Sequence, residues 1–107
     1  MYQMESIAFP VYLSDFEGKG FELSQKTAEK IEFHHGVRNP INTVISILKN
    51  PDLVYESNWA DDHHLYYKAY SRKRFYIVVV ADLTEKRIDT AYVCHKIKQG
   101  KLLWTNL

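Results

Sequence analysis

Four consecutive β-branched residues, Ile77 to Val80, form the centre of the longest apolar run in the chain, Phe75–Ala81. A short continuous run of this kind is typical of a central strand that is covered on both faces. It is far shorter than the roughly 20 apolar residues of a membrane-spanning helix. Because the N-terminus has no basic and apolar leader and Cys94 is the single cysteine, the sequence predicts a soluble cytoplasmic domain that contacts no membrane.

Segments before and after this run also have strand character. Residues 65–70 alternate in a way that suits a strand with one buried face. We expect four strands joined in an antiparallel meander, followed by a short tail around Gly100 that could hold one helical turn. The expected strands are residues 53–55, 65–70, 74–81 and 87–95, with turns at 71–73 and 82–86.

Apolar residues recur at helical spacing in the N-terminal half. Ser24 is a suitable N-cap for a helix over about residues 25–35, which Gly36 would end. Asn39-Pro40 offers an N-cap and a first helical residue for a second helix, and Asn50-Pro51 would end it. The sequence therefore predicts two helices before the strands.

These elements predict an α+β fold in which two N-terminal helices pack on one face of a four-stranded antiparallel sheet. The 107 residues, 46% of them hydrophobic, suit a single domain with one core. Residues 1–20 are expected to form an N-terminal arm and loop. Within it, residues 6–13 could add a short edge strand, because Pro10 cannot donate to a central ladder. Residues 24–105 would form the α+β core.

Charge is distributed unevenly along the chain. Residues 1–64 hold five Lys or Arg against ten Asp or Glu, a net charge of −5, and residues 65–107 hold nine against three, a net charge of +6. A basic half can attract a phosphate backbone. The alternative is that the basic half simply faces the acidic half within one fold. The sequence has no Gly-rich phosphate loop, which argues against a nucleotide-hydrolysing motor.

Two pairs of adjacent histidines are candidate functional residues. His34 and His35 stand at the expected end of the first helix, near Arg38. A helix C-terminus stabilises imidazolium, so a histidine there can shuttle protons near neutral pH; the alternative is an ordinary exposed pair. We interpret His63-His64, after Asp61-Asp62, as part of a solvated loop, because adjacent histidines do not easily ligate one ion. We therefore expect no metal and no cofactor, and a site built from all four histidines is the weaker alternative.

Basic and aromatic residues are interleaved around the expected central strands. Such a surface can hold phosphates and stack unpaired bases. Alternatively, the tyrosines fill the core and the basic side chains are solvated. Thr90 could orient a phosphate, or only reflect the β propensity of threonine. The interleaved residues are Tyr66, Tyr67, Lys68, Tyr70, Arg72, Lys73, Arg74 and Tyr76.

Several short motifs follow one another between residues 24 and 105. They are Lys30-Ile31-Glu32-Phe33-His34-His35-Gly36, Asn50-Pro51-Asp52-Leu53-Val54, Tyr66-Tyr67-Lys68, Val78-Val79-Val80, Thr90-Ala91-Tyr92 and Lys96-Ile97-Lys98-Gln99-Gly100 through Trp104. In order and spacing, this series resembles the barnase–EndoU–colicin–RelE-like nuclease superfamily, especially its small phage- and cyanobacteria-associated members.

The resemblance implies a two-helix, four-stranded fold and metal-independent RNA cleavage. Such cleavage needs a base for the 2′-hydroxyl, an acid for the leaving oxygen and cations for the phosphorane charge. The resemblance makes His35 the acid/base, Lys68 the phosphate clamp, and Thr90 with Tyr92 the residues that orient the scissile phosphate. Further substrate contacts are expected from His34, Arg38, Arg72 and Arg74.

Two positions depart from the family pattern. Lys30 stands where the family has its first histidine, and His34-His35-Gly36 replaces its Arg-His-Pro. The alternative function is therefore a catalytically inactive member that binds RNA or acts as a toxin–antitoxin-type module with an antitoxin-like protein. In both cases the expected ligand is RNA or another phosphate-bearing molecule.

Overall fold

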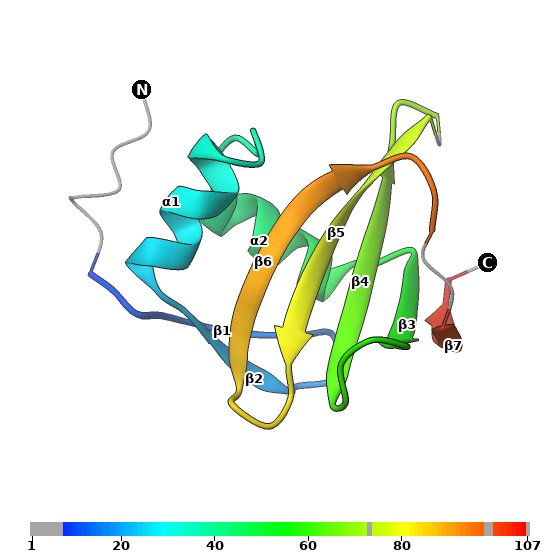
Figure 1. Ribbon diagram of the computed structural model, residues 1–107, viewed down its shortest axis with the longest axis horizontal. Helices are drawn as coiled ribbons and strands as arrows, with labels where there is room; N and C mark the ends of the chain where they lie inside the picture. Colours follow the sequence, from blue (N-terminus) through cyan, green and yellow to red (C-terminus); the bar gives the residue numbers. More distant parts are fainter. Residues whose placement is uncertain (1–7, 73, 98–99, 107) are drawn as a thin grey trace.

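The computed structural model describes residues 8–72, 74–97 and 100–106, which form two helices and seven strands (Figure 1). All the strands belong to one sheet, in the order β1-β2-β6-β5-β4-β3-β7. In chain order the elements are β1 (Val11–Ser14), β2 (Gly20–Leu23), α1 (Gln25–Phe33), α2 (Pro40–Lys49), β3 (Leu53–Ser57), β4 (His63–Tyr70), β5 (Phe75–Asp82), β6 (Arg87–Cys94) and β7 (Gly100–Thr105).

The expected fold, with two helices on a four-stranded antiparallel sheet, is wrong. The sheet has seven strands, and it is mixed because β2 runs parallel to β6. Two segments expected to lack strands account for the difference: residues 20–23 pair with β1, and residues 100–105 pair with β3. The expected edge strand over residues 6–13 begins only at Val11, and residues 1–7 of the expected arm lie outside the described part of the chain.

Local signals position the two helices. The Ser24 side chain accepts a hydrogen bond from the backbone N–H of Thr27 and caps α1, which ends at Phe33, two residues before the expected end. Pro40 begins α2, as predicted, although Asn39 makes no side-chain cap hydrogen bond. Neither described helix is long and apolar enough to cross a membrane.

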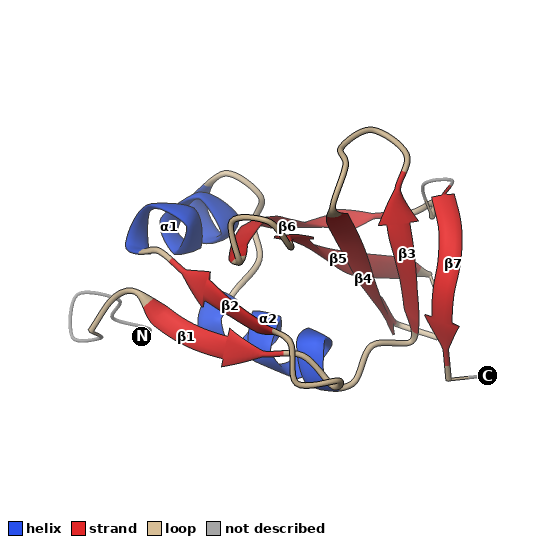
Figure 2. Ribbon diagram, turned by 90° about the horizontal axis from the view of Figure 1, so that it is seen from below, coloured by secondary structure: helices blue, strands red, loops and turns tan. Residues whose placement is uncertain are grey.

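The sheet has a different core on each face. On the helix side, buried residues of α1 and α2 pack against Tyr66, Val79 and Ala91. On the other side, Tyr67 and Val78 are buried under partly exposed residues. Figure 2 shows both helices and the β1–β2 hairpin at one end of the molecule and β3 and β7 at the other. Tyr66 and Tyr67 therefore fill the two cores, which agrees with the alternative that the tyrosines are core residues.

The β1–β2 hairpin meets the rest of the sheet along a short junction. One residue pair, Glu22 and Arg87, joins β2 to β6, and the backbone N–H of Glu22 donates to the carbonyl of Lys86 at 2.9 Å. A second link comes from the loop after β1, where the carboxylate of Asp15 accepts a hydrogen bond from the hydroxyl of Tyr66 on β4. Beyond Arg87, none of the described strands pairs with this edge of β6, and α1 packs beside it (Figure 1).

Candidate functional site

A groove lies between α1 and the free edge of β6. Its volume is about 550 Å³, and its lining includes two cations, Lys30 and Arg87, and two carboxylates. The ammonium of Lys30 donates a hydrogen bond to the backbone carbonyl of Asp89 at 3.0 Å, which joins the helix to the strand. The lining residues are Glu22, Ser24, Thr27, Lys30, Arg87, Ile88, Asp89 and Thr90.

Thr90 is one of the lining residues and carries an unpartnered hydroxyl. Its Oγ1 is buried, and within the described part of the chain it has no hydrogen-bond partner. A buried hydroxyl of this kind costs about 1–3 kcal/mol relative to a paired one. Such groups are rare in folded proteins, so each needs an explanation, and one explanation is a role in binding a ligand.

The ring of His35 lies beside the ring of Tyr92, 57 residues later in the sequence. The ring centroids are 5.9 Å apart and the planes are tilted by 50°. His35 reaches this place because α1 ends just before it and Gly36, with φ of +68°, turns the chain back, so that the N–H of Val37 donates to the carbonyl of Ile31. Tyr92 and Thr90 are two residues apart on β6 and so share one face of the sheet. The structure therefore brings three of the four expected catalytic residues to one region.

Lys68 does not join them. It pairs with Ile77, which pairs with Val93, so its side chain leaves the sheet on the face opposite to Tyr92. Its ammonium donates to the carbonyl of Asn50 at 2.9 Å and lies 4.0 Å from the carboxylate of Asp52. Lys68 thus fastens the end of α2 to β4.

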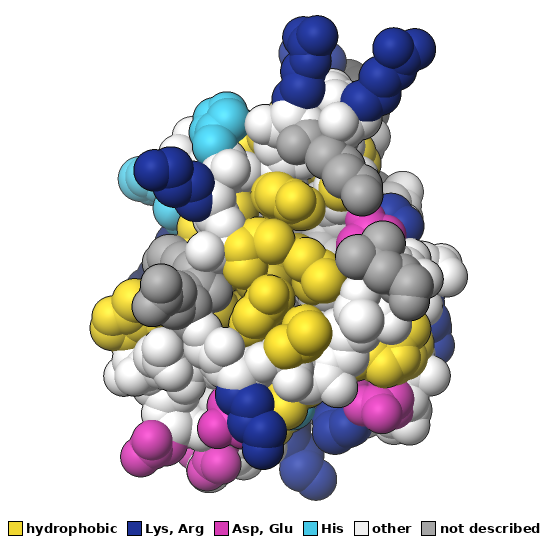
Figure 3. All heavy atoms as spheres, turned by 90° about the vertical axis from the view of Figure 1, so that its right-hand side faces the viewer, with side chains coloured by type: hydrophobic (Ala, Val, Ile, Leu, Met, Phe, Trp, Pro, Cys, Tyr) yellow, Lys and Arg dark blue, Asp and Glu magenta, His cyan; other side chains and the backbone are white. Residues whose placement is uncertain are grey.

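The expected substrate contacts fall into two groups. His34 and Arg38 are exposed in the connection between α1 and α2, near His35. Arg72 and Arg74 are exposed in the β4–β5 turn, where they line a hollow of about 370 Å³ with Phe75. Lys73, between them, lies outside the described residues. Figure 3 shows hydrophobic side chains gathered on the sheet face opposite to the helices and Lys and Arg side chains above them, where this turn lies.

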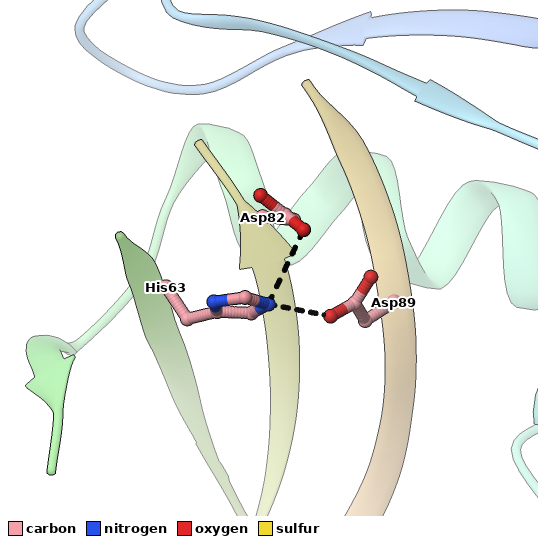
Figure 4. Close-up of side chains that lie close together, drawn as sticks. All are labelled: His63, Asp82 and Asp89. Atoms are coloured by element: carbon pink, nitrogen blue, oxygen red, sulfur yellow. Dashed lines mark hydrogen bonds and ion pairs between the residues drawn. The ribbon is translucent and has the colours of Figure 1, made fainter. Parts of the chain in front are cut away.

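A second cluster joins three strands on the same helix-free face (Figure 4). The Nε2 atom of His63, on β4, lies 2.8 Å from Oδ2 of Asp89 on β6 and 3.4 Å from Oδ2 of Asp82 on β5. The Nδ1 atom of the same ring lies 2.8 Å from the carbonyl of Asp61. His63 is therefore an ordered strand residue, and its interpretation as part of a solvated loop is wrong.

A β-bulge in β6 brings Asp89 to this cluster. Thr90 pairs with Val80, but Ile88 pairs with the next residue, Ala81, so that Asp89 is the extra residue. In regular alternation Asp89 would lie on the helix side of the sheet, opposite to Thr90. With the bulge its carboxylate reaches His63. Asp89 also lines the groove, so the cluster and the groove are neighbours.

Charge and burial shift the pKa values in this cluster. Burial alone would lower the pKa of His63, but hydrogen bonds to the carbonyl of Asp61 and to Asp89, and the charges of both carboxylates, outweigh it and raise the pKa above 6.5. Backbone N–H groups of Glu85 and Thr84, together with the charge of His63, lower the pKa of Asp82. The two carboxylates therefore favour the imidazolium form of His63 more than water does.

His64 lies on the other face of β4 and behaves differently. Its pKa is lowered, first by burial and then by the charge of Lys19. The pKa values of these two adjacent histidines are therefore shifted in opposite directions from 6.5. The alternation of side chains along a strand could have predicted that His63 and His64 lie on opposite faces. The partners of His63 come from other strands, however, and no local sequence pattern indicates this long-range pairing.

No protein-family model matches the chain, and no curated protein or solved structure is significantly similar to it. The resemblance to the nuclease superfamily therefore depends on the short motifs alone and stays a prediction. Within the last motif, Lys98 and Gln99 lie outside the described residues. What the chain does must be argued from the groove, from the His35–Tyr92 contact and from the His63 cluster.

Proposed function

We propose that this chain binds RNA along the free edge of β6 and cleaves its phosphodiester by metal-independent acid/base chemistry. The observation that carries the proposal is the contact of His35 with Tyr92, two residues from Thr90 and its unpartnered hydroxyl. The exposed imidazole of His35 supplies a general base, and the buried hydroxyl supplies a donor that gains a partner when a phosphate binds.

In this mechanism, His35 removes the proton from the ribose 2′-hydroxyl, whose oxygen then attacks the adjacent phosphorus. The hydroxyl of Thr90 and the ammonium of Lys30 stabilise the charge that develops on the phosphorane oxygens, since both line the groove. Tyr92 orients the phosphate beside His35. The 5′-oxygen leaves with a proton from water in the open groove, which gives a 2′,3′-cyclic phosphate and a 5′-hydroxyl.

The cation in this scheme is Lys30 and no longer Lys68. Lys30 occupies the position of the first histidine in the family pattern and reaches the groove from α1. Lys68 is held at the end of α2 on the opposite face. The proposal therefore keeps His35, Thr90 and Tyr92 from the sequence analysis and replaces the expected phosphate clamp.

Cleavage of labelled RNA in the presence of EDTA tests the proposal. We expect His35→Ala to lower the rate by about 10²–10⁴-fold, as for other general bases. Thr90→Val and Lys30→Ala should also lower it, while Lys26→Ala, which removes an exposed lysine of the same helix that does not line the groove, should not. Intact RNA with the wild type, or equal cleavage by His35→Ala, contradicts the catalytic claim. Salt-dependent RNA binding without turnover would instead identify an inactive binding module.

A further inference from the structure

The cluster of His63, Asp82 and Asp89 presents a converging set of ligand atoms. One imidazole nitrogen and one oxygen from each carboxylate all lie within 4.8 Å of one another. The three residues come from three neighbouring strands: His63 and Asp82 are paired across β4 and β5, and Asp89 is the bulged residue between two residues of β6 that pair with β5 (Figure 4). A site on strands is held more precisely than one on loops.

The spacing of these atoms suits a transition-metal ion. An ion about 2.0–2.2 Å from each ligand keeps neighbouring ligands about 3.0–3.5 Å apart in tetrahedral or octahedral coordination. Nε2 of His63 lies 2.8 Å from Asp89 and 3.4 Å from Asp82, close to that requirement before any rearrangement. The carboxylate oxygens of Asp82 and Asp89 lie within 4.8 Å of each other, so an ion in place of the shared proton would draw them closer together.

The surroundings orient each ligand. A carbonyl oxygen only accepts hydrogen bonds, so the contact with Asp61 places a proton on Nδ1 of His63 and directs Nε2 at the carboxylates. The backbone N–H groups of Thr84 and Glu85 both donate to Oδ1 of Asp82 at 3.0 Å, which leaves Oδ2 facing His63. Metal-binding histidines and carboxylates are commonly held by such outer hydrogen bonds.

We propose that His63, Asp82 and Asp89 form a site for one divalent transition-metal ion of the Zn²⁺ or Mn²⁺ type. One imidazole with two carboxylates favours these ions over Mg²⁺ and Ca²⁺, which prefer oxygen ligands alone. Three protein ligands leave coordination positions for water, and Asp89 lines the open groove, through which an ion can enter. This site is independent of the proposed RNA cleavage.

A proton and the metal ion compete for Nε2. The two carboxylates favour a positive charge at this position, and His63 accordingly holds its proton more strongly than an ordinary histidine does. The ion must displace that proton, so binding weakens as the pH falls. The same requirement distinguishes the cluster from nonspecific binding by surface carboxylates, which releases no proton from histidine.

Calorimetric titration of tag-free, chelator-treated protein with ZnCl₂, and loss of the free Mn²⁺ signal in electron paramagnetic resonance, test the proposal. We expect one ion per chain, and tighter binding near pH 7.5 than near pH 6, because a proton and the ion compete for the same nitrogen. Absence of binding for both ions, or binding that is equally tight at the two pH values, overturns the proposal.

Single substitutions locate the site. Asp89→Asn and His63→Gln should each weaken binding by more than about tenfold, because the first replaces a charged carboxylate with a neutral amide and the second removes the imidazole nitrogen. Glu85→Gln removes a nearby exposed carboxylate that is no ligand, and it should bind as the wild type does. Circular dichroism of each variant shows whether it is folded, and Asp89→Asn, at a half-buried position, is the variant best placed to stay so. Wild-type affinity in folded Asp89→Asn, or equal losses in Glu85→Gln, contradicts the assignment.

Discussion

The hydroxyl of Tyr66 lies 2.6 Å from Oδ2 of Asp15, 51 residues earlier in the chain. Both residues are almost completely buried, and the other oxygen of Asp15 accepts backbone N–H groups of Glu17 and Lys19. Because only one residue pair joins β2 to β6, this hydrogen bond is a principal link between the β1–β2 hairpin and the main sheet.

Removal of the Tyr66 hydroxyl should therefore destabilise the protein. Tyr66→Phe leaves a buried carboxylate oxygen without its donor, and we expect a loss of about 1–3 kcal/mol in the free energy of unfolding. Urea denaturation measures it. Tyr12→Phe is the control, because the side chain of Tyr12 is 77% exposed and should contribute nothing measurable. Equal stability of Tyr66→Phe and the wild type would show that this hydrogen bond does not hold the hairpin.

Thr90→Val should have the opposite effect on stability. Valine has the shape of threonine and β propensity as high, and it removes a buried hydroxyl that has no partner within the described residues. We expect the free energy of unfolding to stay unchanged or to rise by up to about 1 kcal/mol. Denaturant unfolding of the variant, beside its RNA cleavage rate, measures both effects. A clear loss of stability would mean that the hydroxyl is already satisfied in the free protein.

Gly100→Ala should loosen β7. A Cβ atom at this position would collide with the backbone carbonyl of Glu56 on β3, and backbone cannot move aside as a flexible side chain can. We expect a destabilisation of about 1–3 kcal/mol, as in other overpacked sites, and faster hydrogen exchange of the β7 amides. Gly20→Ala is the matched control, because the nearest atom to its Cβ would be 4.0 Å away. Similar behaviour of the two variants would contradict the pairing of β7 with β3.

The adjacent histidines of β4 should titrate on opposite sides of pH 6.5. The pKa of His63 is raised and that of His64 is lowered, so NMR titration of their ring protons should give the higher midpoint for His63. Because the folded state holds the His63 proton more tightly than the unfolded state, the stabilisation by His63 is complete below the unfolded pKa and disappears as the pH rises through the folded pKa. His63→Gln should consequently cost more stability near pH 6 than near pH 9. A midpoint for His63 below that of His64 would overturn the described charge environment.

Local signals predicted the helices and central strands, and long-range pairing produced the rest. Ser24, Pro40 and Asn50-Pro51 mark helix ends by their own chemistry, so the bounds of both helices were predicted to within two residues. The segment of β7 has no comparable local signal. Its neighbouring residues Leu102 and Leu103 are both exposed, so they do not show the alternation between buried and exposed side chains that marks many strands. Its place beside β3 depends on a glycine that permits close approach, which a sequence pattern does not reveal.

The residues of the candidate site also fall into those that the sequence predicted and those that depend on long-range pairing. His35, Thr90 and Tyr92 were predicted from motif resemblance, and their roles stay a prediction; the structure places His35 beside Tyr92, two residues from Thr90. The sequence could not show that Lys68 lies away from the other candidate site residues. The face of β4 that carries its side chain depends on where the helices pack. The partners of His63 depend on strand register and on one bulge, which arise only when β4, β5 and β6 assemble.

The bulge at Asp89 makes one functional side chain depend on the insertion of a single residue in β6. Without Asp89, Ile88 and Thr90 would be neighbours and would still pair with Ala81 and Val80, so both would keep their faces in a regular ladder. The carboxylate that reaches His63 would be lost. A related chain without this extra residue could therefore keep Thr90 and Tyr92 in place and lack the third member of the His63 cluster.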